Sequence, residues 1–121
     1  MNPERKIIME LLVLILNKTE CLKTILERFM DSGIRGATIL DSRGMAHSLC
    51  EYNELRFTVS LRELLDPAHK ESNTILVVVE KEQIPVVSKI VNEVTGGLDQ
   101  PDTGVLFTLP VGYAEGFNHS K

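Results

Sequence analysis

Hydrophobic and polar residues follow the same pattern in two parts of the chain. In residues 7–42, and again in residues 74–111, an apolar run precedes an amphipathic helix, a glycine stop and a second apolar run. The expected strands are residues 7–16, 37–40, 74–79 and 104–111. A strand, helix, strand unit used twice predicts an α+β fold. We expect a ferredoxin-like βαββαβ sandwich, with two helices on one face of a four-stranded antiparallel sheet.

The first predicted helix begins where Asn17 and Glu20 have the spacing of a capping box, and it ends before Gly33. Apolar residues then recur at helical spacing and predict its buried face: Leu22, Ile25, Leu26, Phe29 and Met30.

The second predicted helix begins near residues 80–82, with Pro85 in its first turn, and ends at Gly96 and Gly97. Its predicted buried face is Ile84, Val87, Val91 and Val94.

The first predicted strand is apolar on both faces except at Glu10. One face of the sheet is assigned to the helices, so the other face of this strand needs another cover. We therefore expect a second subunit to pack against the sheet.

Residues 43–73 form a long insertion between the second and third predicted strands. Ser60 and Glu63 have capping-box spacing there and predict a short helix that carries Leu61, Leu64 and Leu65. Loops on a rigid scaffold usually carry binding groups, so we look for function in this insertion.

Composition restricts the class of protein. The chain has 121 residues, which predicts a single domain over residues 1–121. Its formal net charge of −4 gives no general attraction to phosphate backbones, so no nucleic acid partner is expected. No apolar run approaches the ~20 residues that span a bilayer, and no signal-peptide cleavage site follows the first run, so we expect a cytoplasmic protein.

The loop TGGLDQPDTG, residues 95–104, is the strongest candidate for binding chemistry. Glycines let a backbone approach a phosphate closely, and successive N–H groups can form a concave anion site without a lysine. The same residues also make an ordinary helix stop followed by a turn. On these residues alone both interpretations stay open.

Three pieces of sequence in a fixed order resemble the PII family of signal-transduction proteins. They are GATILDSRGM at residues 36–45, TGG at residues 95–97 and DTGVLFTLPV at residues 102–111. The resemblance implies a cytoplasmic homotrimer that is a regulator and not an enzyme. It also implies a small anionic effector, bound in clefts between subunits, and an arm formed by residues 43–73 that controls a partner transporter or enzyme.

Carried over by position, the resemblance also implies the ligand-binding residues. Thr38 would lie near an adenine pocket, and Gly44 would start the arm. Asp102, Thr103 and Gly104 would line phosphates. His47 lies in the arm and would be a conditional anion contact, because a histidine changes charge near neutral pH.

Several positions depart from the PII pattern. Val105 replaces the lysine that usually follows the last glycine, and residues 112–121 contain no arginine pair. Ser48 replaces the arm's glutamine, and His47 its neighbouring arginine. Since hydrogen bonds to charged groups contribute roughly 1.5–3 kcal/mol each, triphosphate binding should be weakened. The effector is therefore left open, with an adenine nucleotide as one candidate cofactor.

Two alternatives remain at this point. One is a trimeric interaction module that has lost its effector, which the missing cations favour. The other is a metal-binding trimer of similar fold that uses His47, Cys50 or His69. No nucleophile elbow or serine, histidine and carboxylate arrangement suggests an enzyme.

Overall fold

The computed structural model describes residues 7–45 and 71–117. These residues form four strands and two α-helices in the order strand, helix, strand, strand, helix, strand, and each helix is entered through a short 3₁₀ turn. In order, these elements are β1 (Met9–Leu16), η1 (Thr19–Cys21), α1 (Leu22–Asp31), β2 (Thr38–Ser42), β3 (Ser72–Glu80), η3 (Lys81–Gln83), α4 (Ile84–Thr95) and β4 (Gly104–Pro110). The predicted order of elements is confirmed, and the strands begin or end up to two residues from their expected bounds.

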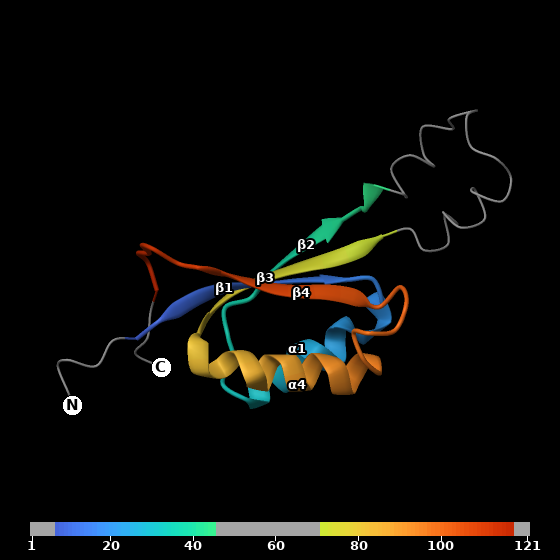
Figure 1. Cartoon of the computed structure of the whole chain (residues 1–121), viewed down its shortest axis with the longest axis horizontal. Coiled ribbons are helices and arrows are strands. Elements are labelled where there is room, and N and C mark those ends of the chain that lie inside the picture. Colours follow the sequence, from blue (N-terminus) through green and yellow to red (C-terminus); the bar gives the residue numbers. More distant parts are fainter. Residues whose placement is uncertain (1–6, 46–70, 118–121) are drawn as a thin grey trace, which may run out of the picture.

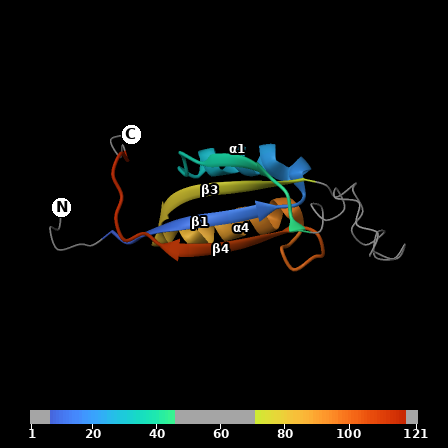
Figure 2. The ribbon, with the colours of Figure 1, turned by 90° about the horizontal axis from the view of Figure 1, so that it is seen from above.

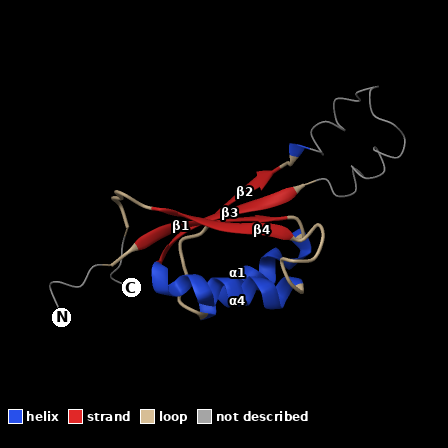
Figure 3. Ribbon diagram, viewed as in Figure 1, coloured by secondary structure: helices blue, strands red, loops and turns tan. Residues whose placement is uncertain are grey.

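The four strands form one antiparallel sheet in the order β2-β3-β1-β4. Both helices lie on the same face of this sheet (Figures 1 and 3). The fold is therefore the predicted ferredoxin-like α+β sandwich.

Alternate residues of the two central strands point into the core. Leu12, Leu14 and Leu16 of β1 pack with Ile75, Val77 and Val79 of β3 beneath the helices. Ile25 and Phe29 of α1, and Val87, Ile90 and Val91 of α4, complete this cluster. This alternation explains why the apolar runs of β1 and β3 have only one face in the core.

The start of α1 differs from the predicted capping box. The 3₁₀ turn η1 precedes the helix, and no side-chain cap is present at its N-terminus. The backbone N–H of Asn17 instead donates to the carbonyl oxygen of Thr103 at 2.9 Å. Asn17 therefore joins the β1 end to the loop before β4, a long-range contact that the local spacing did not reveal.

The second helix begins at the predicted place, through a capping box that precedes α4. Glu80 and Gln83 make reciprocal side-chain to backbone bonds around η3, and Pro85 lies in the first turn of α4. Gly96 ends the helix in the left-handed conformation, with φ of +89°. Val87 and Val91 are buried as predicted, together with Ile90, which the prediction omitted.

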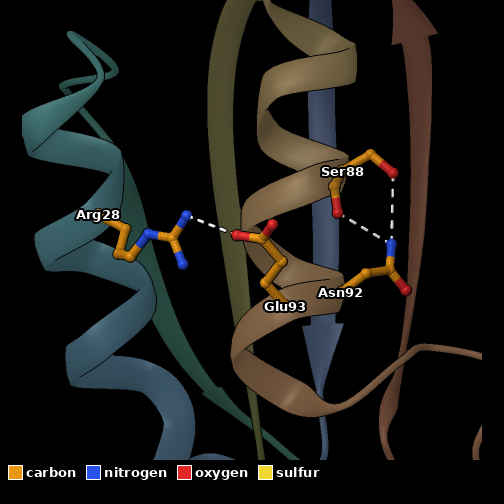
Figure 4. Close-up of polar contacts among 4 residues, drawn as sticks. All are labelled: Arg28, Ser88, Asn92 and Glu93. Carbon is orange, nitrogen blue, oxygen red and sulfur yellow. Dashed lines mark hydrogen bonds and ion pairs between the residues drawn. The ribbon is translucent and has the colours of Figure 1, made fainter.

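The two helices are joined by one ion pair. The Arg28 guanidinium donates to the Glu93 carboxylate at 2.8 Å (Figure 4). This hydrogen bond, opposed by desolvation and aided by the positive charges of Arg28 and Lys89, lowers the pKa of Glu93. Met30, which was predicted to face the core, is instead 62% exposed on α1. The prediction for Met30 was wrong because α1 lies beside the edge strand β2, where no further strand covers the Met30 side chain.

Residues 111–117 cross the end of the sheet at which β1 begins (Figure 2). Gly116 and Phe117 there line a cleft of about 500 Å³ together with Arg35 and Glu80. The segment that follows β4 thus lies at the opposite end of the sheet from the Thr95 to Gly104 loop.

Candidate functional site

The candidate loop and both legs of the arm leave the same end of the sheet. In the strand register, Gly104 of β4 pairs with Leu16 of β1, Leu16 pairs with Asn73 of β3, and Asn73 pairs with Asp41 of β2. These four residues form one row across the sheet. The segments that adjoin this row therefore leave the same end of the sheet (Figure 1); they are residues 43–45, 71 and 96–103.

Asn92 of α4 holds the start of the loop. Its side-chain oxygen accepts from the backbone N–H of Leu98 at 2.8 Å. Its amide nitrogen donates to the carbonyl oxygen of Ser88 at 2.9 Å, one turn back in the helix (Figure 4). The helix thus fixes the loop's path through an asparagine that the sequence pattern did not single out.

The loop uses several of its N–H groups within the chain. Thr95 Oγ1 donates to the carbonyl oxygen of Val91 at 2.7 Å and accepts from the N–H of Gly97 at 3.3 Å. Gln100 N–H donates to the carbonyl oxygen of Gly97 at 3.1 Å. The N–H of Gly96 donates to the carbonyl oxygen of Asn92 at 3.1 Å. With Leu98, four N–H groups of the expected anion nest are therefore already bonded internally.

The charge of the loop also departs from that of a phosphate site. The loop follows the C-terminus of α4, where the aligned peptide dipoles leave partial negative charge. Asp99 and Asp102 are exposed in it. Lys18 is a nearby cation, and its Nζ donates to the carbonyl oxygen of Thr95 at 2.8 Å. It therefore bonds the last residue of α4. Within one chain this loop is more acidic than a phosphate-binding loop usually is.

Thr103 and Gly104 have structural roles where they were expected to line a ligand. Thr103 is buried, its hydroxyl donates to the carbonyl oxygen of Pro101 at 3.3 Å, and its own carbonyl accepts from Asn17 and Lys18. A Cβ atom on Gly104 would lie 2.6 Å from the carbonyl oxygen of Ile15. The glycine is thus required by the close approach of β4 to β1.

Of the three residues predicted to line phosphates, Asp102 is the exposed one. Its φ of +57° places it in the left-handed region, where aspartate and asparagine are tolerated better than most residues. Its side chain is accessible at the arm end of the sheet.

Thr38 lies on the edge strand opposite β4, and Gly44 follows that strand. Thr38 is exposed on the edge strand β2, and its row runs through Leu76 and Val13 to Phe107 of β4. Three strand spacings of ~4.8 Å separate β2 from β4, so the two edges are about 14 Å apart. The structure therefore does not bring Thr38 and Asp102 together within one chain. Gly44 is exposed just beyond β2, and His47 lies outside the described residues.

Three hydroxyl groups tie the legs of the arm together on the face away from the helices. Ser42 and Ser72 are cross-strand partners with their Oγ atoms 2.7 Å apart. Thr74 Oγ1 donates to Ser42 Oγ at 2.8 Å. The arm thus begins from a fixed base.

The sheet face away from the helices carries an exposed apolar surface. We call this the outer sheet face; its most exposed apolar side chains are Leu40, Val105, Phe107 and Leu109, each between 42% and 57% exposed. Phe107 is the cross-strand partner of Val13 of β1, which is 7% exposed. Contiguous apolar surface of this kind usually marks an interaction site.

Within residues 7–45 and 71–117, no group of three histidine, cysteine, aspartate or glutamate side chains could hold a metal ion. His47, Cys50 and His69, the predicted metal candidates, fall outside those ranges, as do Ser48 and the predicted helix around Leu61. The helices in the same ranges are too short or too polar to cross a membrane.

Comparison with solved structures identifies proteins of the same fold. A functionally unknown protein from Pediococcus pentosaceus ATCC 25745 superposes with a TM-score of 0.62 and 17% identity, over 93% of this chain and 100% of that one. PII from Arabidopsis thaliana, in a structure bound to citrate, superposes with a TM-score of 0.56 and 18% identity, over 91% and 82% of the two chains. No family model and no curated protein matches the sequence. The chain therefore has the ferredoxin-like α+β fold that PII also has.

Proposed function

We propose that this protein is a PII-like regulator that binds a small anionic effector and controls a partner protein through the arm of residues 43–73. One observation carries the proposal: both legs of the arm and the Thr95 to Gly104 loop leave one end of the sheet. A ligand held at that end can favour one arrangement of the arm over another. Such a preference is what ligand control of a partner requires.

The regulator is a homotrimer in this proposal. The exposed outer sheet face supports association, because burying its apolar side chains is favourable. The separation of about 14 Å between the β2 and β4 edges gives a second reason. A small ligand cannot touch Thr38 and Asp102 of one chain together, so the binding cleft is placed between subunits.

The effector is a small anion, with an adenine nucleotide as one candidate. The Arabidopsis PII structure, which has the same fold, is bound to citrate, a compact polyanion. Residues 95–104 contain no lysine or arginine. Lys18 lies beside the loop but is bonded to the carbonyl oxygen of Thr95, so the other cations for such a ligand would come from the arm or from a neighbouring subunit. The proposed protein is cytoplasmic, forms a single domain over residues 1–121 and has no catalytic role.

A second candidate function is an interaction module of the same assembly that has no effector. The internal bonding of the Gly97, Leu98 and Gln100 N–H groups favours it, since those donors are not offered to a ligand. In this case the arm docks on its partner constitutively.

Assembly is tested by light scattering on the purified chain and on two lysine variants. Phe107 and Val86 are each 42% exposed, but Phe107 lies on the outer sheet face and Val86 on α4. Phe107→Lys should release monomers, because it places a charge in the interface, whereas Val86→Lys should leave the trimer mass unchanged. A monomeric parent protein would contradict the trimer.

Effector binding is tested by thermal shift with citrate, 2-oxoglutarate, phosphate, AMP, ADP and ATP. A ligand specific for the folded state at 100 times its Kd adds about 2.7 kcal/mol of stability. Asp102→Asn tolerates the same backbone conformation and removes one negative charge, so it should increase the shift caused by an anion. Asp31→Asn, at the far end of α1, is the matched control.

If none of these anions shifts the melting temperature of an intact trimer, the effector-free module is the better description. If the anion binds and Asp102→Asn leaves its affinity unchanged, the effector binds elsewhere. A substitution at Gly104 would not test binding, because even a Cβ at that position meets the backbone of β1.

A further inference from the structure

A cleft of about 500 Å³ lies at the end of the sheet where β1 begins. Three segments line it: the end of β3, the loop between α1 and β2, and the segment after β4. They contribute Glu80, Arg35 and Phe117 respectively. The volume falls within the ~300–1,000 Å³ of ordinary ligand sites, so the cleft can hold a small molecule.

Two opposite charges line this cleft without neutralising each other. Arg35 is exposed and Glu80 is half-buried. Among the described residues the one ion pair joins Arg28 to Glu93 on the helices, so Arg35 and Glu80 are too far apart to pair directly. A ligand that carries both charges can bridge them. A plain anion is instead repelled by the carboxylate, and a plain cation by the guanidinium.

Local contacts hold both charged residues in place. Glu80 and Gln83 form the reciprocal capping box before α4, in which the Glu80 carboxylate accepts one backbone N–H. A carboxylate has about four acceptor sites, so this one can still accept from a ligand. Ile34, directly before Arg35, is buried, and its N–H donates to the carbonyl oxygen of Phe29 at 2.8 Å. The backbone under each charge is thus fixed, which reduces the entropy lost on binding.

The cleft has a further donor and open space beside its charges. The Gln83 side-chain oxygen accepts from the N–H of Glu80 at 2.8 Å, which leaves the amide nitrogen as a donor on the cleft wall. Gly33 and Gly36 are left-handed, with φ of +81° and +77°, and a Cβ on either would meet nothing within 4 Å. The loop that carries Arg35 therefore leaves room for a ligand.

We propose that this cleft binds a free α-amino acid. The α-carboxylate of the ligand accepts from the Arg35 guanidinium and the Gln83 amide, and its α-ammonium group donates to the Glu80 carboxylate. Phe117 supplies an apolar wall for the ligand's side chain. Recognition thus depends on both charges of the ligand at once.

This site is separate from the effector site of the proposed function. Thr38 pairs with Leu76 of β3, and Glu80 lies four residues further along that strand, about 13 Å away at ~3.3 Å per residue. Asn73, in the row at the arm end, is about 23 Å from Glu80 by the same measure. The inference therefore goes beyond the proposed regulator and does not depend on its effector.

The test is NMR titration of the isotope-labelled full chain with alanine, leucine, phenylalanine and glutamine. We expect saturable shifts from at least one of these amino acids, confined to residues 33–36, 78–83 and 116–117. The matched controls are the N-acetyl and amide derivatives of the same amino acid, each of which lacks one of its two charges. Neither derivative should bind, because each leaves one charge of the cleft without a partner.

Two variants locate the site. Arg35→Gln and Glu80→Gln each remove one charge, and the second keeps an oxygen that can accept in the capping box. Each should weaken binding by about tenfold or more, as expected for the loss of a charge-assisted hydrogen bond. Lys89→Gln and Glu82→Gln, at exposed positions of α4 and η3, are the matched controls and should bind as the parent chain does.

Failure of all four amino acids, equal binding of a derivative, or unchanged affinity in either cleft variant would each overturn the inference. Shifts confined to residues 95–104 would assign the ligand to the candidate loop and overturn it as well. A change in assembly caused by Arg35→Gln, measured by light scattering, would identify the cleft as a contact between copies of the chain and would also overturn it.

Discussion

Replacing Gly104 by alanine places a methyl group against the backbone of the central strand. The added Cβ would lie 2.6 Å from the carbonyl oxygen of Ile15 and 3.4 Å from Cα of Leu16. Neither atom can retreat easily, since β1 is paired on both sides. The start of β4 must therefore move away from β1.

This movement lowers the free energy of unfolding. Overpacking at a close contact costs about 1–3 kcal/mol. The carbonyl of Thr103, next to Gly104, also accepts from Asn17 and Lys18, and loss of these bonds adds about 0.5–1.5 kcal/mol each. The variant should lose about 2–6 kcal/mol, or about 8–24 °C in melting temperature for a chain of this length.

Gly44→Ala is the matched control, because Gly44 was predicted from the same family pattern. A Cβ there meets nothing within 4 Å, and the backbone is not left-handed. Alanine at such a position stabilises a protein by about 0.4–1 kcal/mol through the unfolded state. Both variants are measured by chemical denaturation at one protein concentration, since assembly contributes to stability. Free energies of unfolding within about 0.5 kcal/mol of each other would refute the steric argument.

Three further variants test the loop and the helix pair. Lys18→Met removes the bond that ends α4 and should cost about 1 kcal/mol in chemical denaturation; an unchanged midpoint would show that the cap is dispensable. Asn92→Leu leaves the N–H of Leu98 without its acceptor, so hydrogen exchange at that amide should accelerate, and unaltered protection would contradict this. Arg28 lowers the pKa of Glu93, so this carboxylate stabilises the fold above its unfolded pKa, and the contribution is lost as pH falls through the folded value. Glu93→Gln should therefore reduce the decline of melting temperature in acid, and an identical pH profile would contradict it.

The sequence predicted the loop of the candidate site but not the side chains that hold it in place. The segment from residue 95 to 104 was identified correctly as a loop before the last strand, because its glycines and aspartates carry local turn signals. Its ligand role is still a prediction. Lys18 was missed because its partner Thr95 lies 77 residues away, and no local spacing encodes such a contact. Asn92 lies only six residues before its partner Leu98, but the helix and glycine patterns do not show which polar side chain of the helix turns toward the loop.

The order of strands and helices was determined by the sequence itself. Apolar periodicity is a local property, so it specified β1, α1, β2, β3, α4 and β4 without reference to their neighbours. Tertiary structure alone decided which face of each element is covered. Met30 fits the helical stripe but is exposed, since α1 lies at the rim of the sheet beside an edge strand. Likewise Gly104 is required by the backbone of a strand almost ninety residues earlier, because close approach between distant segments exists only in the folded chain.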